Sequence, residues 1–110
     1  MRRMLLPIAL TMFAVAGLGA QDDKKAAAGK ALYEKQGCVK CHQIAGKGSK
    51  ISPLDGVGSK LSEAEIKQWL TDPDTMTAKL AKKPAAKMKK VVLPDADIDA
   101  LVHYMLSLKK

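Results

Sequence analysis

The sequence predicts a small all-α fold, a single domain in which three main helices are joined by long loops. Three observations support this prediction. The chain has 110 residues, a length that suits one domain. Three segments carry helical patterns. No segment of the chain shows the alternation of apolar and polar residues that is typical of a strand. The segments between them are rich in glycine, serine, lysine and proline, which favour loops.

The first helix is predicted at residues 22–36. Its alanine-rich sequence favours a helix, and the acidic Asp22 and Asp23 suit a helix N-terminus. Gly37 follows at the point where glycine commonly ends a helix. The segment 44–60 is rich in glycine, serine and lysine, contains Pro53, and is predicted to be a loop.

The second helix is predicted to begin at Ser62, which forms a capping-box pattern with Glu65. Its apolar stripe consists of Ile66, Trp69 and Leu70. The Asp72-Pro73 pair is expected to end this helix. A short helical turn at residues 75–82 is a further candidate, which Pro84 would break.

The last helix has the clearest pattern. Asp95, which follows Pro94, is the expected cap, and further acids stand in the first turn. Five apolar residues recur at helical spacing: Ile98, Leu101, Val102, Met105 and Leu106. Lys109 and Lys110 complement the C-terminal end of this helix.

The first 20 residues have the composition of a secretory signal peptide. Arg2 and Arg3 give a basic start, residues 4–18 are almost wholly apolar, and polar sequence begins abruptly at Gln21. We predict a signal peptide at residues 1–20, cleaved between residues 16 and 20, and one domain at residues 21–110. The alternative is an uncleaved membrane anchor. The apolar stretch is short for a span of about 20 residues, and Pro7 interrupts it.

The most informative motif is Cys38-Val39-Lys40-Cys41-His42, the attachment signature of a c-type haem. Residues i and i+3 share one face of a helical turn, so Cys38 and Cys41 can bond the two vinyl groups of one porphyrin. His42 can then reach the iron from one side. Because export leads to an oxidising compartment, a simple disulfide is the alternative. The small domain favours the haem, which would supply an apolar body that one Trp and two Tyr do not.

The opposite face of the iron needs a second ligand or stays open. Methionine there is typical of electron-transfer haems and raises the reduction potential. Met105 lies on the apolar stripe and is expected in the core, and a packing or surface role suits Met76. Met88 lies in a loop with prolines and lysines, which can fold a thioether across the ring. We therefore predict Met88 as the second ligand, with Met76 or an open site as alternatives.

These segments together resemble a class I bacterial monohaem cytochrome c. The resemblance covers residues 21–110. The residues that carry it are Gly29 and Tyr33, the motif at 38–42, the segments 53–58 and 69–73, Lys87-Met88, and residues 101–105. In one place the sequence departs from the family pattern, because Lys89 stands where the family usually has a proline after the ligand methionine.

The resemblance implies roles for several residues. The first and last helices would cross near the haem edge, with Gly29, Tyr33 and Tyr104 at the crossing. The carbonyl of Pro53 would accept the proton on the second nitrogen of His42, a bond that fixes the imidazole. Trp69 would meet a haem propionate. The simpler alternatives are that Pro53 is only a turn residue and Trp69 only a core residue.

The implied function is that of a soluble periplasmic electron carrier, not an enzyme. One haem c, with His42 and Met88 as its axial ligands, would shuttle single electrons between respiratory or photosynthetic-type redox partners. The alternative is a haem enzyme or gas-sensing subunit with an open distal site. Such a distal site would have few residues for acid–base chemistry, because His103 lies outside the apolar stripe and is expected to face solvent. A zinc site from both cysteines and both histidines lacks the second clustered pair of ligands that structural zinc usually has.

The formal net charge of +8 points to acidic partners. Six lysines surround Met88: Lys79, Lys82, Lys83, Lys87, Lys89 and Lys90. Lys40 and Lys47 flank the haem motif. This charge would steer the protein towards acidic docking surfaces on redox partners, although a merely solvated face is the simpler alternative. Nucleic acid is not an expected partner, because no aromatic residues interleave these lysines. We expect a monomer without stable membrane insertion once the leader is cleaved.

Overall fold

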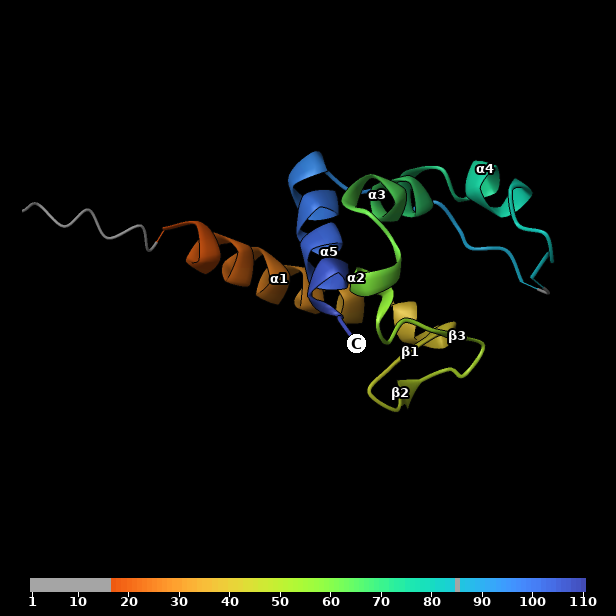
Figure 1. The fold of residues 1–110 in the computed structure, drawn as a ribbon, viewed down its shortest axis with the longest axis horizontal. Coiled ribbons are helices and arrows are strands. Elements are labelled where there is room, and N and C mark those ends of the chain that lie inside the picture. Colours follow the sequence, from red (N-terminus) through yellow and green to blue (C-terminus); the bar gives the residue numbers. More distant parts are fainter. Residues whose placement is uncertain (1–16, 85) are drawn as a thin grey trace, which may run out of the picture.

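The computed structural model describes residues 17–84 and 86–110, without the side chains of residues 17–20. The chain is mostly helical (Figure 1). Three helices are long: α1 (Gly17–Lys35), α3 (Glu63–Thr71) and α5 (Asp95–Ser107). Two are short, α2 (Val57–Lys60) and α4 (Pro73–Ala78). The three predicted main helices are therefore confirmed. The first 16 residues of the predicted signal peptide lie outside the described residues.

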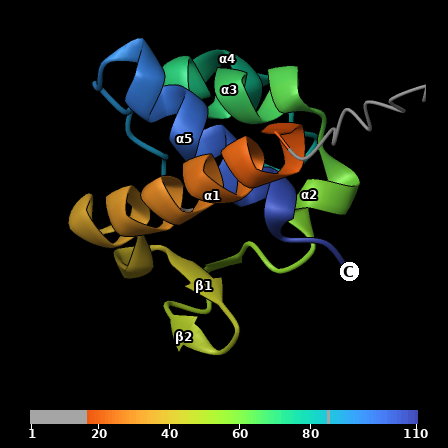
Figure 2. The same ribbon diagram turned by 90° about the vertical axis from the view of Figure 1, so that its left-hand side faces the viewer.

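Helices α1 and α5 cross at the centre of the molecule, with α3 and α4 on one side of them and a short sheet on the other (Figure 2). Gly29 lies at the crossing, where an added Cβ would overlap the carbonyl oxygen of Ala100 and lie 2.7 Å from the Cβ of Tyr104. The rings of Tyr33 and Tyr104 meet edge to face, with centroids 5.8 Å apart. The crossing expected from the family resemblance is thus present, and it needs a residue without a side chain at position 29.

The hydrophobic core lies around this crossing. Its buried members are Tyr33, Ile66, Leu70, Ile98, Leu101, Val102 and Met105. Four of the five residues of the predicted α5 stripe are buried, and the fifth, Leu106, packs against the core while partly exposed. The helical period in the sequence therefore identifies the face of α5 that packs against α1 and α3.

The predicted helix boundaries hold for α3 and shift for its neighbours. Ser62 and Glu65 form both bonds of the capping box. Pro73 opens α4 two residues before the predicted turn, because proline is well tolerated at the first position of a helix. The prediction of Asp95 as the cap of α5 is wrong. Pro94 occupies the cap position, and Asp95 is the first helical residue, where its charge still faces the helix N-terminus.

Helix α1 begins at Gly17, before the predicted start at Asp22. The described sequence before Asp22 contains no proline, and helix propagation adds one hydrogen bond for each residue fixed. The helix can therefore extend backwards, although Gly17 and Gly19 make this turn less favourable than alanine would. The glycine at position 37 behaves as predicted, because Gly37 is in the left-handed conformation (φ 70°) directly after the helix.

The segment 44–60 is not a plain loop, and the prediction that the chain contains no strand is wrong. Three very short strands form a sheet in the order β2-β1-β3: β1 (His42–Ile44), β2 (Lys47–Gly48) and β3 (Ser52–Pro53). Strands of two or three residues are too short to show an alternating pattern. The turn between β1 and β2 uses Ala45 and Gly46, both with positive φ.

Candidate haem site

The haem motif begins in a 3-10 turn, η1 (Cys38–Lys40), directly after Gly37. The N–H of Cys41 donates to the carbonyl of Cys38 at 3.1 Å, which closes the turn. In a 3-10 turn residues i and i+3 lie one above the other, so the turn brings Cys41 back to the side of the chain from which Cys38 starts. Both cysteines are free thiols, and the disulfide alternative is not what the structure contains. Burial raises the pKa of the Cys38 thiol, whereas Cys41 is exposed.

His42 is held by the short sheet. Its Nδ1 lies 2.9 Å from the carbonyl oxygen of Ser52, the residue that pairs with it across β1 and β3. A carbonyl only accepts, so Nδ1 carries the proton and Nε2 keeps the lone pair that a metal requires. Such a bond orients a ligand histidine and increases its basicity.

The acceptor of this bond was predicted one residue too late. The structure assigns it to Ser52, not to Pro53, which is exposed in β3 and pairs with Gln43. The parallel register sets this choice, because it brings the backbone of residue 52 opposite His42. No property of a side chain identifies a backbone carbonyl as an acceptor, so the sequence could not distinguish the two residues.

Strand β2 and the residue after it also hold the haem motif in place, a feature that the sequence analysis missed. The N–H of Ser49 donates to the carbonyls of Val39 and His42, at 2.9 and 3.1 Å. Gly48 has φ 105°, and an added Cβ would overlap the carbonyl oxygen of His42. The glycine is therefore required both for its backbone angle and for the close approach.

Two observations show that these residues fit a haem. The hydroxyl of Tyr33 is buried without a hydrogen-bond partner among the described residues, as expected if a bound group supplies one. Burial, and then the neighbouring Cys38, raise the pKa of Tyr33 to about 12. Many apolar side chains also pack on the core while staying partly exposed, among them Cys38, Leu54, Val57 and Met88. A large apolar cofactor would cover them.

Comparison with known proteins agrees with this site. The family model for cytochrome c matches residues 26–109. The chain belongs to the cytochrome c family. It binds a covalently attached c-type haem with iron, and the family match indicates electron transfer through this haem. No curated protein and no solved structure matches the chain.

The cytochrome c domain places its methionines in different environments. Met76 and Met105 are buried, with exposed fractions of 9% and 6%. Met88 is partly exposed and packs against the core from the segment before α5. It also lines an open hollow of about 520 Å³, together with residues 71–74 and its neighbours 87, 89 and 90. Met88 and Cys38 thus pack against the same core while partly exposed, whereas Met105 is a buried member of that core.

Trp69 lies on α3 and is only partly buried. It is not among the side chains that pack on the core cluster of the described residues. The last turn of α3 also carries Leu70, whose carbonyl accepts a bond from the N–H of Val91 at 2.9 Å. Trp69 is therefore close in sequence to the point where the Met88 segment joins α3.

His103 does not face solvent as predicted, since its side chain is only 18% exposed. Its Nδ1 donates to the carbonyl of Asp99 at 2.9 Å, and its Nε2 lies 3.5 Å from an oxygen of Asp22 on α1. The reason is the packing of α1 along α5, which brings Asp22 of α1 next to His103.

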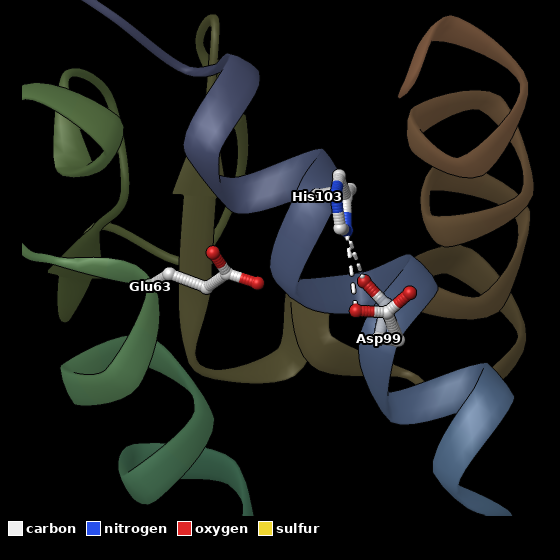
Figure 3. Close-up of side chains that lie close together, drawn as sticks. All are labelled: Glu63, Asp99 and His103. Atoms are coloured by element: carbon white, nitrogen blue, oxygen red, sulfur yellow. Dashed lines mark hydrogen bonds and ion pairs between the residues drawn. The ribbon is translucent and has the colours of Figure 1, made fainter. Parts of the chain in front are cut away.

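The described residues contain one group of three side chains that could hold a metal ion, namely Glu63, Asp99 and His103 (Figure 3). It includes neither cysteine nor His42, so the structure gives no support to the zinc alternative. Protein partners account for two of its members. Lys25 pairs with Asp99 at 2.9 Å and lowers the pKa of that carboxyl, and His103 is bonded as described above.

None of the described helices combines the length and the apolar character needed to cross a bilayer.

Proposed function

We propose that this cytochrome c is a periplasmic one-electron carrier whose haem iron is ligated by His42 and Met88. The observation that carries the proposal is the bond from His42 Nδ1 to the Ser52 carbonyl, beside two free thiols. It directs Nε2 to act as the ligand and keeps the imidazole from rotating. Haem supplies the reversible change between ferric and ferrous iron, and the protein holds the ligands and excludes water.

Met88 completes this proposal as the second ligand. It is the methionine that the fold leaves partly exposed beside the core, in a segment without regular secondary structure. A thioether ligand favours ferrous iron and raises the reduction potential. With both axial positions filled, no substrate can bind to the iron, which is why a carrier is favoured over a haem enzyme or gas sensor.

Replacement of the methionine ligand tests this proposal. In the holoprotein, Met88→Ala should abolish the far-red methionine–iron charge-transfer band of the ferric form and open the ferrous form to carbon monoxide. Met76→Ala is the matched control and should keep the band, since Met76 is a buried residue of α4. Loss of the band in Met76→Ala alone would move the ligand to Met76. A wild-type protein that binds carbon monoxide readily at neutral pH would establish the open-site alternative.

The location and the partners are part of the proposal. Residues 1–20 would direct export and be removed between residues 16 and 20, which the intact mass of the exported protein measures. An uncleaved leader would instead anchor the domain to the membrane on its periplasmic side. The six lysines around Met88 are all exposed, and they would form a positive face for acidic redox partners of a monomeric carrier.

A further inference from the structure

The side chain of Lys83 folds back onto the end of α4. Its ammonium group donates to three backbone carbonyls, those of Thr77, Ala78 and Leu80, at 3.1, 2.7 and 3.2 Å. An ammonium group has three donors, so all of them are used. The last carbonyls of a helix have no partner within the helix, and Lys83 supplies one.

This contact fixes the chain on one side of Met88. On the other side, the N–H of Val91 donates to the Leu70 carbonyl at the end of α3, at 2.9 Å. Between these two anchors, the described residues of the segment 84–90 form no hydrogen bond. Met88 lies in this span and packs against the core. The position of its sulfur therefore depends on where the two ends of the span are held.

The two anchors differ in how they can be removed. The Val91 bond is made by the backbone and persists in any side-chain variant. The Lys83 contact depends on one side chain. Without it, the nearest anchored residue before Met88 is Leu80, whose N–H donates to the Thr77 carbonyl at 3.1 Å, and the span between the anchors becomes three residues longer. A longer span has more conformations in which Met88 is away from its place, and the cost of closing it rises with its length.

We propose that Lys83 is a positioning residue for Met88. By closing the end of α4 it shortens the span between the anchors and favours the arrangement in which the Met88 thioether stays at its ligand position. This inference rests on the proposed function, in which Met88 ligates the iron. It assigns to Lys83 a role different from that of the neighbouring lysines, whose charge faces solvent.

Imidazole competition in the ferric holoprotein tests the role of Lys83. Imidazole can bind the iron only when the Met88 sulfur leaves, so its apparent affinity reports how easily Met88 departs. Lys83→Met should raise this affinity by about 3- to 30-fold, from the lost capping contact and the longer span. Lys82→Met is the matched control, because Lys82 is exposed and forms no hydrogen bond or ion pair with any described residue. It should change the affinity by less than about twofold. Lys83→Arg keeps both charge and donors and should stay near wild type.

The outcomes separate the two proposals. An affinity unchanged in Lys83→Met, or raised equally in Lys83→Met and Lys82→Met, overturns the role of Lys83, since either result leaves only a general effect of charge. If wild type lacks the methionine charge-transfer band, Met88 is not a ligand, and the proposed function fails before the variants are compared. The band in wild type, together with a selective effect in Lys83→Met, supports both.

Discussion

The two sides of the haem site are built in different ways. On the His42 side, hydrogen bonds of the backbone hold the motif. They close the turn at Cys38, pair His42 with Ser52, and join the N–H of Ser49 to two carbonyls of the motif. On the Met88 side, the proposed ligand lies in a span held at its ends by Lys83 and Val91. One side is fixed locally, and the other depends on distant anchors.

This difference predicts where the site is stable and where it can change. Segments with few buried contacts and few backbone hydrogen bonds open at lower free energy than densely bonded ones. We therefore expect ligand exchange to occur at Met88 while His42 stays in place. With Met88 as the proposed ligand, the firmly held His42 side would preserve the site, and the thioether on the other side would raise the reduction potential.

The largest effect is expected from breaking the His42 side at Gly48. Gly48→Ala would place a Cβ onto the His42 carbonyl at a φ of 105°, a region that L residues rarely adopt. We expect it to lower the free energy of unfolding of the holoprotein by about 2–4 kcal/mol, measured by chemical denaturation. Gly46→Ala is the matched control, because its Cβ meets nothing within 4 Å and only the φ of 79° is unfavourable. It should cost about 1–2 kcal/mol. Equal losses in both variants would contradict the close approach at Gly48.

A smaller effect is expected at Tyr33, which is buried in the core near Cys38. If the bound haem or its water gives the buried hydroxyl a partner, Tyr33→Phe should destabilise the holoprotein by about 1–2 kcal/mol. A gain in stability would instead mean that the hydroxyl stays unpaired in the holoprotein. Chemical denaturation of wild type and Tyr33→Phe at pH 7 measures the sign of the difference in their free energies of unfolding.

The same residue predicts a dependence on alkaline pH. Burial raises the pKa of Tyr33 to about 12 in the folded protein, above its ordinary value of 10.0. The unfolded chain therefore loses this proton first, and the stability that Tyr33 contributes is complete below pH 10 and is lost between pH 10 and about 12. Tyr33→Phe should lose less stability over this range than wild type. If the free energy of unfolding falls in parallel with pH for the two proteins, Tyr33 is not the group that titrates.

The contrast between the two sides also explains what the sequence could predict. The capping box at Ser62 and the stripe of α5 are local patterns, and the structure confirms both. The Cys-x-x-Cys-His motif is also a local pattern, and the family match supports the c-type haem that it predicts. The Ser52 acceptor and the Ser49 bonds depend on the register of strands only two or three residues long. Such a register is set by turn geometry and tertiary contacts, which leave no periodic signal.

For the Met88 side, composition identified a lysine-rich loop but could not distinguish its members. Lys82 and Lys83 are neighbours of the same type, yet only Lys83 folds back onto α4. Which lysine reaches the helix end depends on the path of the chain after Leu80. His103 shows the same limit, because its burial depends on α1, which is distant in the sequence.

The smallest effect is expected from the surface charge around Met88. Oxidation of the ferrous protein by hexacyanoferrate(III), followed by stopped flow, should slow as ionic strength rises, because salt screens exposed charges beyond about 10 Å at 0.1 M. At low salt, Lys87→Gln should slow the reaction by about two- to threefold. Lys30→Gln removes the same charge from an exposed position on α1, outside the Met88 segment; it is the control and should slow the reaction less. The oxidation rates of the two variants should become equal at high salt. Equal slowing by both would mean that net charge, rather than a positive face beside Met88, attracts the anion.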